Sequence, residues 1–324
     1  MMKQILPLDS TRYQRHLIHG EDRDWAETNC YADVWIELLH AWGFEPRAAL
    51  AFTVAIDFEG DQWTFFKFPH ADLFELYGLD VQELALWQPL IRHIEEQVGQ
   101  GRPVLVEMDS FYLPDTAGTA YQRAHVKSTI AVNEIDVENR RLGYFHSQGY
   151  YHLHDADFVG VFHLQGPVDS ARMPPFAEFV KRRSVTSPRG KDLTERSVSL
   201  LKRRWSLLPE HNPFEAFKTR LEADLKWLTA ETLDTFHQYS FATLRQFGAC
   251  YELAATYLRW LHESQVAHLE DAIAAFSDLS TGAKTVQFQL ARAMARKKPL
   301  ELSAIDHMAK QWKVAMVELD KKFH

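Results

Sequence analysis

The feature that most constrains the fold is a change in sequence pattern part-way along the chain. Runs of β-branched and aromatic residues that are typical of strands occur before about residue 165, as in HVKSTIAVNEID from residue 125 onward. From about Pro174 onward the patterns are helical, with apolar residues recurring every three or four positions. Helices combined with antiparallel strands indicate an α+β domain, and successive amphipathic helices favour a bundle. We therefore expect an α+β domain over residues 1–165 and an all-α helical bundle over residues 166–324.

Local patterns refine this expectation. Aromatic and β-branched runs on both sides of residues 137–140 predict a hairpin. The stretch 48–69 favours a second hairpin with its turn at residues 59–61, although its alanine-rich start is also compatible with a helix. In the second half, Asn212 as an N-cap followed by Pro213 predicts the start of a helix.

Composition is that of a soluble globular protein. Of the 324 residues, 46% are hydrophobic and 25% are charged, and the net charge is −8. The longest uncharged apolar stretch, AALAFTVAI over residues 48–56, is too short for a membrane span, and the first residues contain no apolar run of signal-peptide length. The two cysteines do not make a disulfide framework, and no CxxC pair suggests zinc. We expect a cytoplasmic protein whose main partner is neither a membrane nor nucleic acid.

The stretch ETNCYADVWIELLHAWGFEP, residues 27–46, is a strong helix signal that opens on a cysteine. Asn29 is a favourable N-cap and Gly43 a favourable stop, so we expect Cys30 at the first helical position. Free backbone N–H groups and the positive end of the helix dipole favour a reactive thiolate there. Alternatively, Cys30 packs beneath the helix start, because free cysteine is among the most buried residue types. Cys250 lies inside a helical pattern, and we expect it in the core.

A thiolate nucleophile needs a base within hydrogen-bond reach. His125 opens the strand pattern HVKSTIAV, and a histidine at a strand start that faces a helix N-terminus has the Cys–His geometry of papain-like enzymes. The order of Cys30 and His125 in the chain also fits that architecture. Because the chain has 16 histidines, the same spacing is compatible with a surface histidine at a loop–strand junction.

The combined motifs resemble a known family. NCYADVWIELLHAWGFEP, VLVEMDSFYLPDTAGTAYQRAH, HVKSTIAVNEID and LGYFHSQGYYHL are similar to the bacterial family catalogued as domain of unknown function 1839, over most of the chain. Residues 25–165 are more distantly similar to the family of the N-terminal domain of butirosin biosynthesis protein H, a papain-like acyltransferase. The shared elements are the Cys-led helix, a His-led strand that ends near Asp136, and a segment that comprises Asp109, Tyr112, Leu113 and Pro114.

This resemblance implies a papain-like fold for residues 1–165 and acyl transfer through a cysteine, with Cys30 as nucleophile and His125 as base. Such an enzyme moves an acyl or aminoacyl group from a carrier-protein thioester to a small-molecule amine. No cofactor is implied beyond the phosphopantetheine arm of the carrier protein. Rival expectations are a cysteine hydrolase of small amides or peptides, and a non-catalytic binding protein that kept the fold.

The third catalytic residue departs from the family pattern. In papain-like enzymes the orienting residue lies on the strand after the histidine, where this sequence has YFHSQ. We therefore expect His146 in this role, with Gln148, Asn133 and Asp136 as alternatives. The family's oxyanion glutamine has no counterpart, so a backbone N–H at the helix start is the expected oxyanion donor.

The loop DSFYLPDTAGTAY is the expected substrate-binding segment, with Asp109 and Tyr112 as its binding residues. Asp109 at a strand end would pair with the amine of an aminoacyl group or would simply cap the turn. The stretch FHSQGYYHLHDAD competes as a metal site, because His152 and His154 alternate on a strand and imidazole suits zinc or iron. No HExxH helix accompanies these histidines, and we expect no metal.

Basic residues gather in two runs, VKRRSVTSPRGK over residues 180–191 and LKRRW over residues 201–205. Each run is compatible with a solvated helix face or with a docking surface for an acidic partner. Because a carrier protein is acidic, we expect these cations to steer it toward the cysteine. The residues concerned are Lys181, Arg182, Arg183, Arg203 and Arg204.

Overall fold

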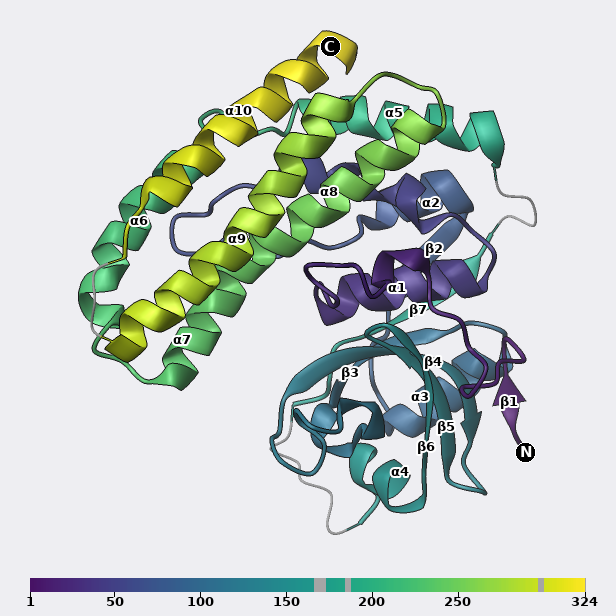
Figure 1. Ribbon diagram of the computed structural model, residues 1–324. Coiled ribbons are helices and arrows are strands. Elements are labelled where there is room, and N and C mark those ends of the chain that lie inside the picture. Colours follow the sequence, from purple (N-terminus) through teal and green to yellow (C-terminus); the bar gives the residue numbers. More distant parts are fainter. Residues whose placement is uncertain (166–172, 184–187, 297–299, 324) are drawn as a thin grey trace. The chain divides into compact units, whose positions relative to one another are not determined.

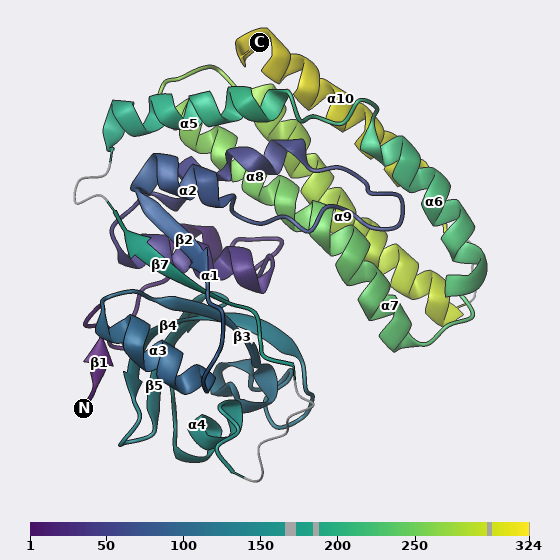
Figure 2. The ribbon, with the colours of Figure 1, turned by 180° about the vertical axis from the view of Figure 1, so that it is seen from behind.

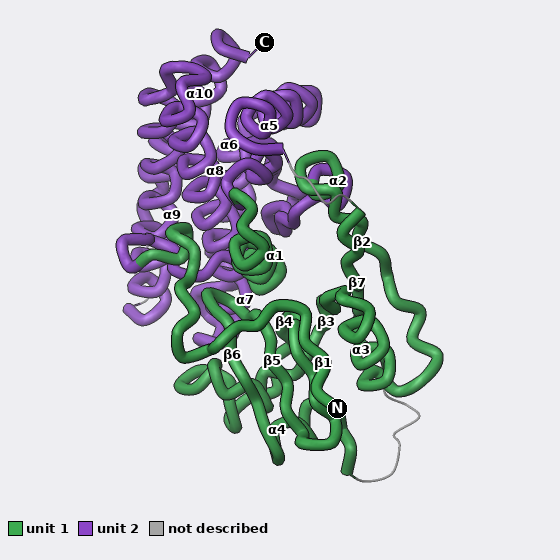
Figure 3. The backbone as a smooth tube through the Cα atoms, turned by 90° about the vertical axis from the view of Figure 1, so that its right-hand side faces the viewer, with its two compact units in different colours: residues 1–20, 29–45, 73–187 green, residues 21–28, 46–72, 188–324 purple. Residues whose placement is uncertain are grey.

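The structure, a computed structural model, describes residues 1–165, 173–183, 188–296 and 300–323. The chain forms two compact units, which Figure 3 shows in different colours. Unit 1 comprises residues 1–20, 29–45 and 73–187, and unit 2 comprises residues 21–28, 46–72 and 188–324. The protein is mixed α/β, with an antiparallel sheet in its N-terminal region followed by helices.

Unit 1 is built around an antiparallel sheet (Figure 1). From one edge to the other, its strands are β2 (Leu79–Glu83), β7 (Ala177–Arg182), β3 (Val104–Asp109), β4 (Lys127–Asp136), β5 (Arg141–His146) and β6 (Gly149–His154). The short strand β1 (Lys3–Gln4) also pairs with β4. The hairpin predicted around residues 137–140 is confirmed, because β4 and β5 pair across that turn.

Different helices cover the two faces of this sheet (Figure 2). Alternate strand residues, among them Val106 of β3, Ile130 of β4 and Tyr144 of β5, are buried in an apolar core. The helices α3 (Leu90–Gly99) and α4 (Asp155–Val161) contribute apolar side chains to the same core. This face of the sheet is therefore the α3/α4 face.

The opposite face is covered by α1 (Cys30–Ala41). The Tyr31 hydroxyl donates to Oε2 of Glu178 at 2.9 Å, and Glu178 lies opposite Leu105 in the pairing of β7 with β3. Because paired residues of adjacent strands point to the same side of a sheet, Leu105 also faces α1. Side chains alternate along a strand, so Asp109 at the end of β3 lies on this α1 face as well.

Unit 1 extends further along the chain than the sequence pattern indicated. We expected a domain boundary between residues 165 and 166, but β7 lies beyond it and pairs with β2 and β3 in the sheet. A strand of six residues carries little local signal, and its place depends on partners that are distant in sequence.

Shorter elements connect the sheet and the helices. The 3-10 helices of unit 1 are η1 (Leu17–His19), η3 (Ser110–Tyr112) and η4 (Pro114–Thr116). The helix α2 (His70–Tyr77) lies where the chain passes from unit 2 into unit 1.

Unit 2 is mainly helical. Its elements are the 3-10 helix η2 (Pro46–Ala55), α5 (Gly190–Trp205), α6 (Pro213–Leu228), α7 (Leu233–Ser240), the π-helix η5 (Phe241–Arg245), α8 (Gln246–Glu263), α9 (Glu270–Arg296) and α10 (Ser303–Phe323). The predicted helix start at Asn212 is confirmed, because its side chain accepts the N–H of Phe214 and Pro213 opens α6.

The segment before α2 contributes to the core of unit 2. The alanine-rich start of the stretch 48–69 is helical, and Phe58 and Trp63 form an isolated antiparallel bridge across the predicted turn. The fully buried Trp63 ring packs against Phe214 and Phe247, with 4.9 Å between ring centroids in each pair. Residues 46–72 are therefore part of the helical unit, although they precede most of the sheet in the sequence.

Candidate functional site

The first candidate feature is the start of α1, where Cys30 is the first helical residue, as predicted. The Asn29 side chain accepts the N–H of Ala32 at 2.9 Å, and Gly43 follows the helix with a φ of 74°. Both predicted ends of the helix are thus confirmed. The Cys30 side chain is partly exposed at the positive end of the helix dipole.

The second cysteine has a very different environment. Cys250 is completely buried in α8, and its sulfur lies 3.6 Å from the carbonyl oxygen of Thr53. Burial raises the pKa of the Cys250 thiol well above its usual value, because the charged thiolate is disfavoured in an apolar surrounding. The core position predicted for Cys250 is confirmed.

A histidine–aspartate pair lies where β3 ends and β4 begins. Nδ1 of His125 is 2.6 Å from Oδ2 of Asp109, and the imidazole stacks on Phe111 with 4.5 Å between ring centroids. Oδ1 of Asp109 accepts the N–H of Phe111 at 3.0 Å, so Asp109 also caps η3, which is one of its two expected roles. The His125 side chain is 67% exposed.

The other predicted residues of this region are only partly brought together. No hydrogen bond between described residues joins Cys30 to His125. The Tyr112 ring makes an edge contact with the His125 ring at 6.4 Å. Tyr112 also packs closely on Gly160 of α4, where an added Cβ would lie 2.2 Å from the ring. Tyr112 is therefore held between the His125 loop and the α3/α4 face.

His146, the residue expected to orient His125, has other partners. Its Nδ1 lies 2.5 Å from Oδ2 of Asp115, and its Nε2 lies 2.6 Å from the Ser128 hydroxyl. His146 shares the side of β5 that carries Tyr144, which is buried in the α3/α4 core. Asp109 points to the opposite face, so His146 and the His125–Asp109 pair lie on different sides of the sheet.

The three alternative orienting residues are engaged elsewhere. Asn133 exchanges hydrogen bonds with the backbone of Leu6, and Gln148 accepts a 2.6 Å hydrogen bond from Arg15. Asp136 caps the turn after β4 through two hydrogen bonds from Asn139. Asp109 is thus the described residue that orients His125. The Asp109–His125 pair follows from the register of β3 on β4, and this register cannot be read from the sequence.

Comparison with family profiles covers both units. The profile of the DUF1839 N-terminal domain matches residues 14–182, and that of the DUF1839 C-terminal domain matches residues 190–321. The chain belongs to the DUF1839 family. The resemblance to this family is therefore confirmed, and no curated protein matches the chain. Within the described ranges of this DUF1839 protein, no helix is long and apolar enough to cross a membrane.

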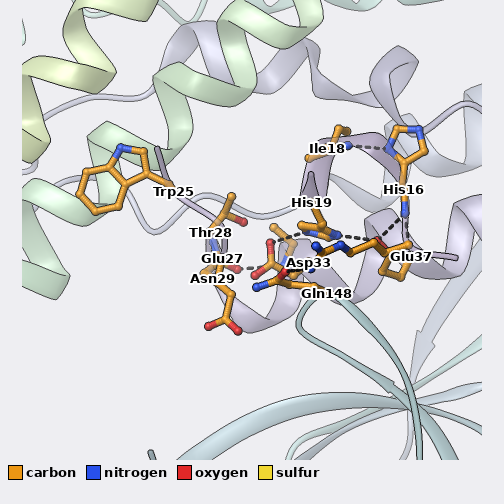
Figure 4. A network of polar contacts seen from close by, with 12 residues as sticks. His16, Ile18, His19, Trp25, Glu27, Thr28, Asn29, Asp33, Glu37 and Gln148 are labelled. Carbon is orange, nitrogen blue, oxygen red and sulfur yellow. Dashed lines mark hydrogen bonds and ion pairs between the residues drawn. The ribbon is translucent and has the colours of Figure 1, made fainter. Parts of the chain in front are cut away.

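A buried ionic network on α1 of this DUF1839 chain escaped the sequence analysis (Figure 4). His19 lies between two carboxylates, with Nδ1 2.5 Å from Glu37 and Nε2 3.2 Å from Asp33. All three side chains are almost completely buried. Burial alone lowers the pKa of His19, but the hydrogen bonds to Asp33 and Glu37 outweigh it and raise the pKa to about 9. Cys30 precedes Asp33 by one helical turn.

The signal for this network was present in the sequence but was obscured by the apolar stripe. Asp33 and Glu37 are four positions apart and therefore share one side of α1. The Tyr13 hydroxyl donates to Glu37 at 2.7 Å, and the backbone N–H of His16 donates to the same carboxylate. Carboxylates within a buried helix face require such partners, and they tie the N-terminal segment to α1.

The two histidines of the alternative metal site lie on the same side of β6, as predicted, with 6.1 Å between their ring centroids. His152 also contacts Ser10, Arg141 and Glu134, whereas His154 is exposed. Among the described residues, one cluster of side chains that could bind a metal ion lies in unit 2. Its ligand atoms lie within 4.8 Å of one another, and its members are His262, His268 and Glu270.

Several cations of the basic runs have partners within their own unit. In unit 1, Arg182 packs over the ring of Trp42, and Arg183 forms an ion pair with Asp80 at 2.7 Å. Lys181 lies over the ring of Phe179. In unit 2, Arg204 forms an ion pair with the buried Asp72 at 2.6 Å. The middle of the first run, residues 184–187, lies outside the described residues.

Proposed function

We propose that unit 1 of this DUF1839 protein is a papain-like domain that transfers an acyl or aminoacyl group from a carrier-protein thioester to an amine through Cys30. One observation carries the proposal. His125 is hydrogen-bonded to Asp109 on the sheet face that α1 covers, and Cys30 is the first residue of α1. A partly exposed thiol at a helix start and an oriented imidazole on the same face supply the groups that nucleophilic catalysis needs.

The chemistry follows from the roles of these three side chains. Asp109 holds Nδ1–H of His125, which leaves Nε2 as the proton acceptor. His125 removes the proton of Cys30, and the sulfur attacks the thioester carbonyl carbon. The carrier thiol leaves with a proton from His125. The acceptor amine then attacks the acyl-cysteine, gives its proton to His125, and the Cys30 thiolate departs.

The first turn of α1 supports the charged steps. Backbone N–H groups at a helix start lack intrahelical acceptors, and the helix dipole is positive there. Both effects would stabilise the oxyanion that forms when the sulfur attacks the thioester carbonyl. The exposed His125 side chain has room to approach the sulfur on substrate binding, because catalytic hydrogen bonds often tighten only in the complex.

The partners follow from the same proposal. The donor would be an acyl- or aminoacyl-carrier protein, whose phosphopantetheine arm presents the thioester, and the acceptor would be a small-molecule amine. Both oxygens of Asp109 are hydrogen-bonded within the chain, so we assign this carboxylate to His125 and not to the substrate amine. Tyr112, beside His125, remains the proposed substrate-binding residue.

Two other functions have a specific observation in their favour. The exposure of His125 allows water to reach the base, which would favour a cysteine hydrolase with the same two residues. The lack of a hydrogen bond between Cys30 and His125 in the described chain favours a non-catalytic papain-like binding protein.

Acyl loading tests the proposal. Wild-type protein is incubated with an aminoacyl-carrier protein, and intact mass spectrometry measures the mass added to the chain. We expect a hydroxylamine-sensitive adduct on Cys30 that is lost in Cys30→Ala, retained in Cys250→Ala, and transferred on addition of an amine. Release of the free acid without an amine acceptor would favour the hydrolase. A folded protein that accepts no acyl group from any carrier or small thioester would favour the binding protein.

A further inference from the structure

A second set of polar residues in unit 1 has the connectivity of a serine triad. The Ser128 hydroxyl lies 2.6 Å from Nε2 of His146, and Nδ1 of His146 lies 2.5 Å from Oδ2 of Asp115. In a serine hydrolase, the carboxylate holds one imidazole nitrogen protonated and the other nitrogen accepts the serine proton. The same connectivity is present here, with one partner for each ring nitrogen.

Strand register and one loop assemble this set. Ser128 lies opposite Met108 in the β3–β4 pairing, and both Met108 and Tyr144 are buried in the α3/α4 core. Ser128 and His146 therefore project from adjacent strands toward the same face. Asp115 comes from η4, and its second oxygen accepts a 2.5 Å hydrogen bond from the Tyr144 hydroxyl.

The His146 and Asp115 side chains are held more rigidly than a pair of groups on the protein surface would be. The side chains of His146 and Asp115 are each 4% exposed, and both carboxylate oxygens of Asp115 are hydrogen-bonded. A buried imidazole whose two nitrogens are both engaged has one orientation, and preorganisation of this kind is what general-base catalysis requires.

The serine lies at the rim of this buried set. Ser128 retains 9% of its surface, whereas residues 122–127 immediately before it are exposed. Val126, two residues before Ser128, is an exposed apolar side chain, with 49% of its surface accessible. A hydroxyl on a residue with so little exposed surface is more accessible to a small ester than to a polymer.

We propose that Ser128 is a second nucleophile, which acts on short-chain carboxylic esters with His146 as base and Asp115 as the positioning residue. The Ser128 oxygen attacks the ester carbonyl carbon while its proton passes to Nε2 of His146. The alcohol leaves with that proton, and an acyl-serine remains. Water then attacks the acyl group, gives a proton to His146, and the acid departs as Ser128 regains its proton. Ester and water become acid and alcohol.

This centre does not depend on the cysteine. Ser128 and His146 lie on the α3/α4 face, whereas Asp109 lies on the α1 face. Loss of Cys30 would therefore leave the serine chemistry intact, and loss of Ser128 would leave acyl loading of Cys30 intact. The two proposals fail separately.

The test uses a small phosphorylating reagent, diisopropyl fluorophosphate, on the full-length protein, with peptide mass spectrometry to locate the adduct. We expect one adduct, on Ser128, in the wild type and equally in Cys30→Ala. His146→Ala should slow its formation by at least about 10³-fold. The matched control is Ser110→Ala, which removes a buried hydroxyl that donates to the Val126 carbonyl and not to a histidine.

Circular dichroism measures whether each variant is folded. Labelling of the wild-type protein tests the proposal even if a variant fails to fold. The wild type should also hydrolyse p-nitrophenyl acetate, and prior labelling of Ser128 should abolish this activity. Folded wild-type protein that carries no adduct on Ser128, or labelling that persists unchanged in folded His146→Ala, would overturn the proposal.

Discussion

His125 and Asp109 are sixteen positions apart in the sequence, yet Nδ1 of one lies 2.6 Å from Oδ2 of the other. The antiparallel register of β3 on β4, in which Asp109 pairs with Lys127, brings them together. An imidazole held in this way has a fixed tautomer, because its Nδ1 carries the proton that the carboxylate accepts. The pair is the basis of the proposed cysteine chemistry.

Substitution of Asp109 should affect catalysis more than stability. Asp109→Asn keeps the shape but reverses the preferred tautomer of His125, so we expect kcat/KM for acyl transfer to fall by about 10²–10⁴-fold. The matched control is Glu107→Gln on the same face of β3, because Glu107 forms a 2.7 Å ion pair with the exposed Lys127 and not with a histidine. Equal activity in both variants would remove Asp109 from the mechanism.

The two cysteines should differ strongly in reactivity. Cys30 is partly exposed at a helix start, whereas burial raises the pKa of Cys250. We expect iodoacetamide to alkylate Cys30 much faster than Cys250 at mildly acidic pH, because Cys30 is accessible and Cys250 is completely buried. Competitive alkylation read by mass spectrometry measures the ratio. Labelling of the two thiols at the same rate in the folded protein would contradict the nucleophile assignment.

The His19 network makes the stability of unit 1 depend on pH. The pKa of His19 is raised from 6.5 to about 9, so the folded chain holds a proton that the unfolded chain releases between these values. The contribution is complete below pH 6.5 and is lost as the pH rises through about 9. It is on the order of 3 kcal/mol at its maximum.

Chemical denaturation between pH 6 and 10, together with an NMR titration of the His19 imidazole, measures this effect. His19→Gln should be less stable at pH 6, because Asp33 and Glu37 would remain buried without their cation. It should also lose most of the pH dependence in this window. His154→Gln at an exposed position is the control. A His19 imidazole that titrates near 6.5 would show that the carboxylates do not hold the proton.

We expect the purified protein to carry no stoichiometric metal. His152 is engaged with Ser10 and Arg141, so the histidines of β6 are structural in this interpretation. Elemental analysis and unfolding with and without a chelator test it. Bound zinc that is lost in the His152→Ala, His154→Ala double variant would establish the alternative. Zinc that is lost only on substitution of His268 would place the ion in unit 2.

Charge reversal in the basic runs tests carrier docking. Lys181→Glu should slow loading of Cys30 from a carrier-protein thioester, and more so at low salt, because steering by charge is screened by ions. Loading from a small thioester should be nearly unchanged. Lys321→Glu on α10 is the matched control, since Lys321 is an exposed lysine with an acidic neighbour as its partner. Equal slowing by both variants would mean that net charge alone is responsible.

Local signals predicted the elements well. Asn29 and Gly43 mark the ends of α1, Asn212 marks the start of α6, and the turn around residues 137–140 joins β4 to β5. In each case the signal is local, because helix caps, helix stops and hairpin turns are each determined by a few neighbouring residues. Cys250 was also predictable, because a cysteine inside an amphipathic helix pattern is usually buried.

Features that depend on distant partners were not predictable in this way. The role of Asp109 depends on the register of two strands, and β7 depends on strands far earlier in the chain. His146 was expected beside His125, but alternation along β5 directs it to the other face of the sheet. A shift of one residue in a strand reverses its faces, and the sequence pattern alone does not fix that register.

The chain alternates between the two units, and this has a consequence for the evolution of the protein by recombination. Trp63 belongs to the core of unit 2, yet it is encoded between α1 and most of the sheet of unit 1. A genetic break near residue 187 would separate Trp63 from Phe214 and Phe247 and leave the helices without part of their centre. Replacement of residues 188–324 alone should therefore destabilise the helical unit of this protein, because its core also requires residues 46–72.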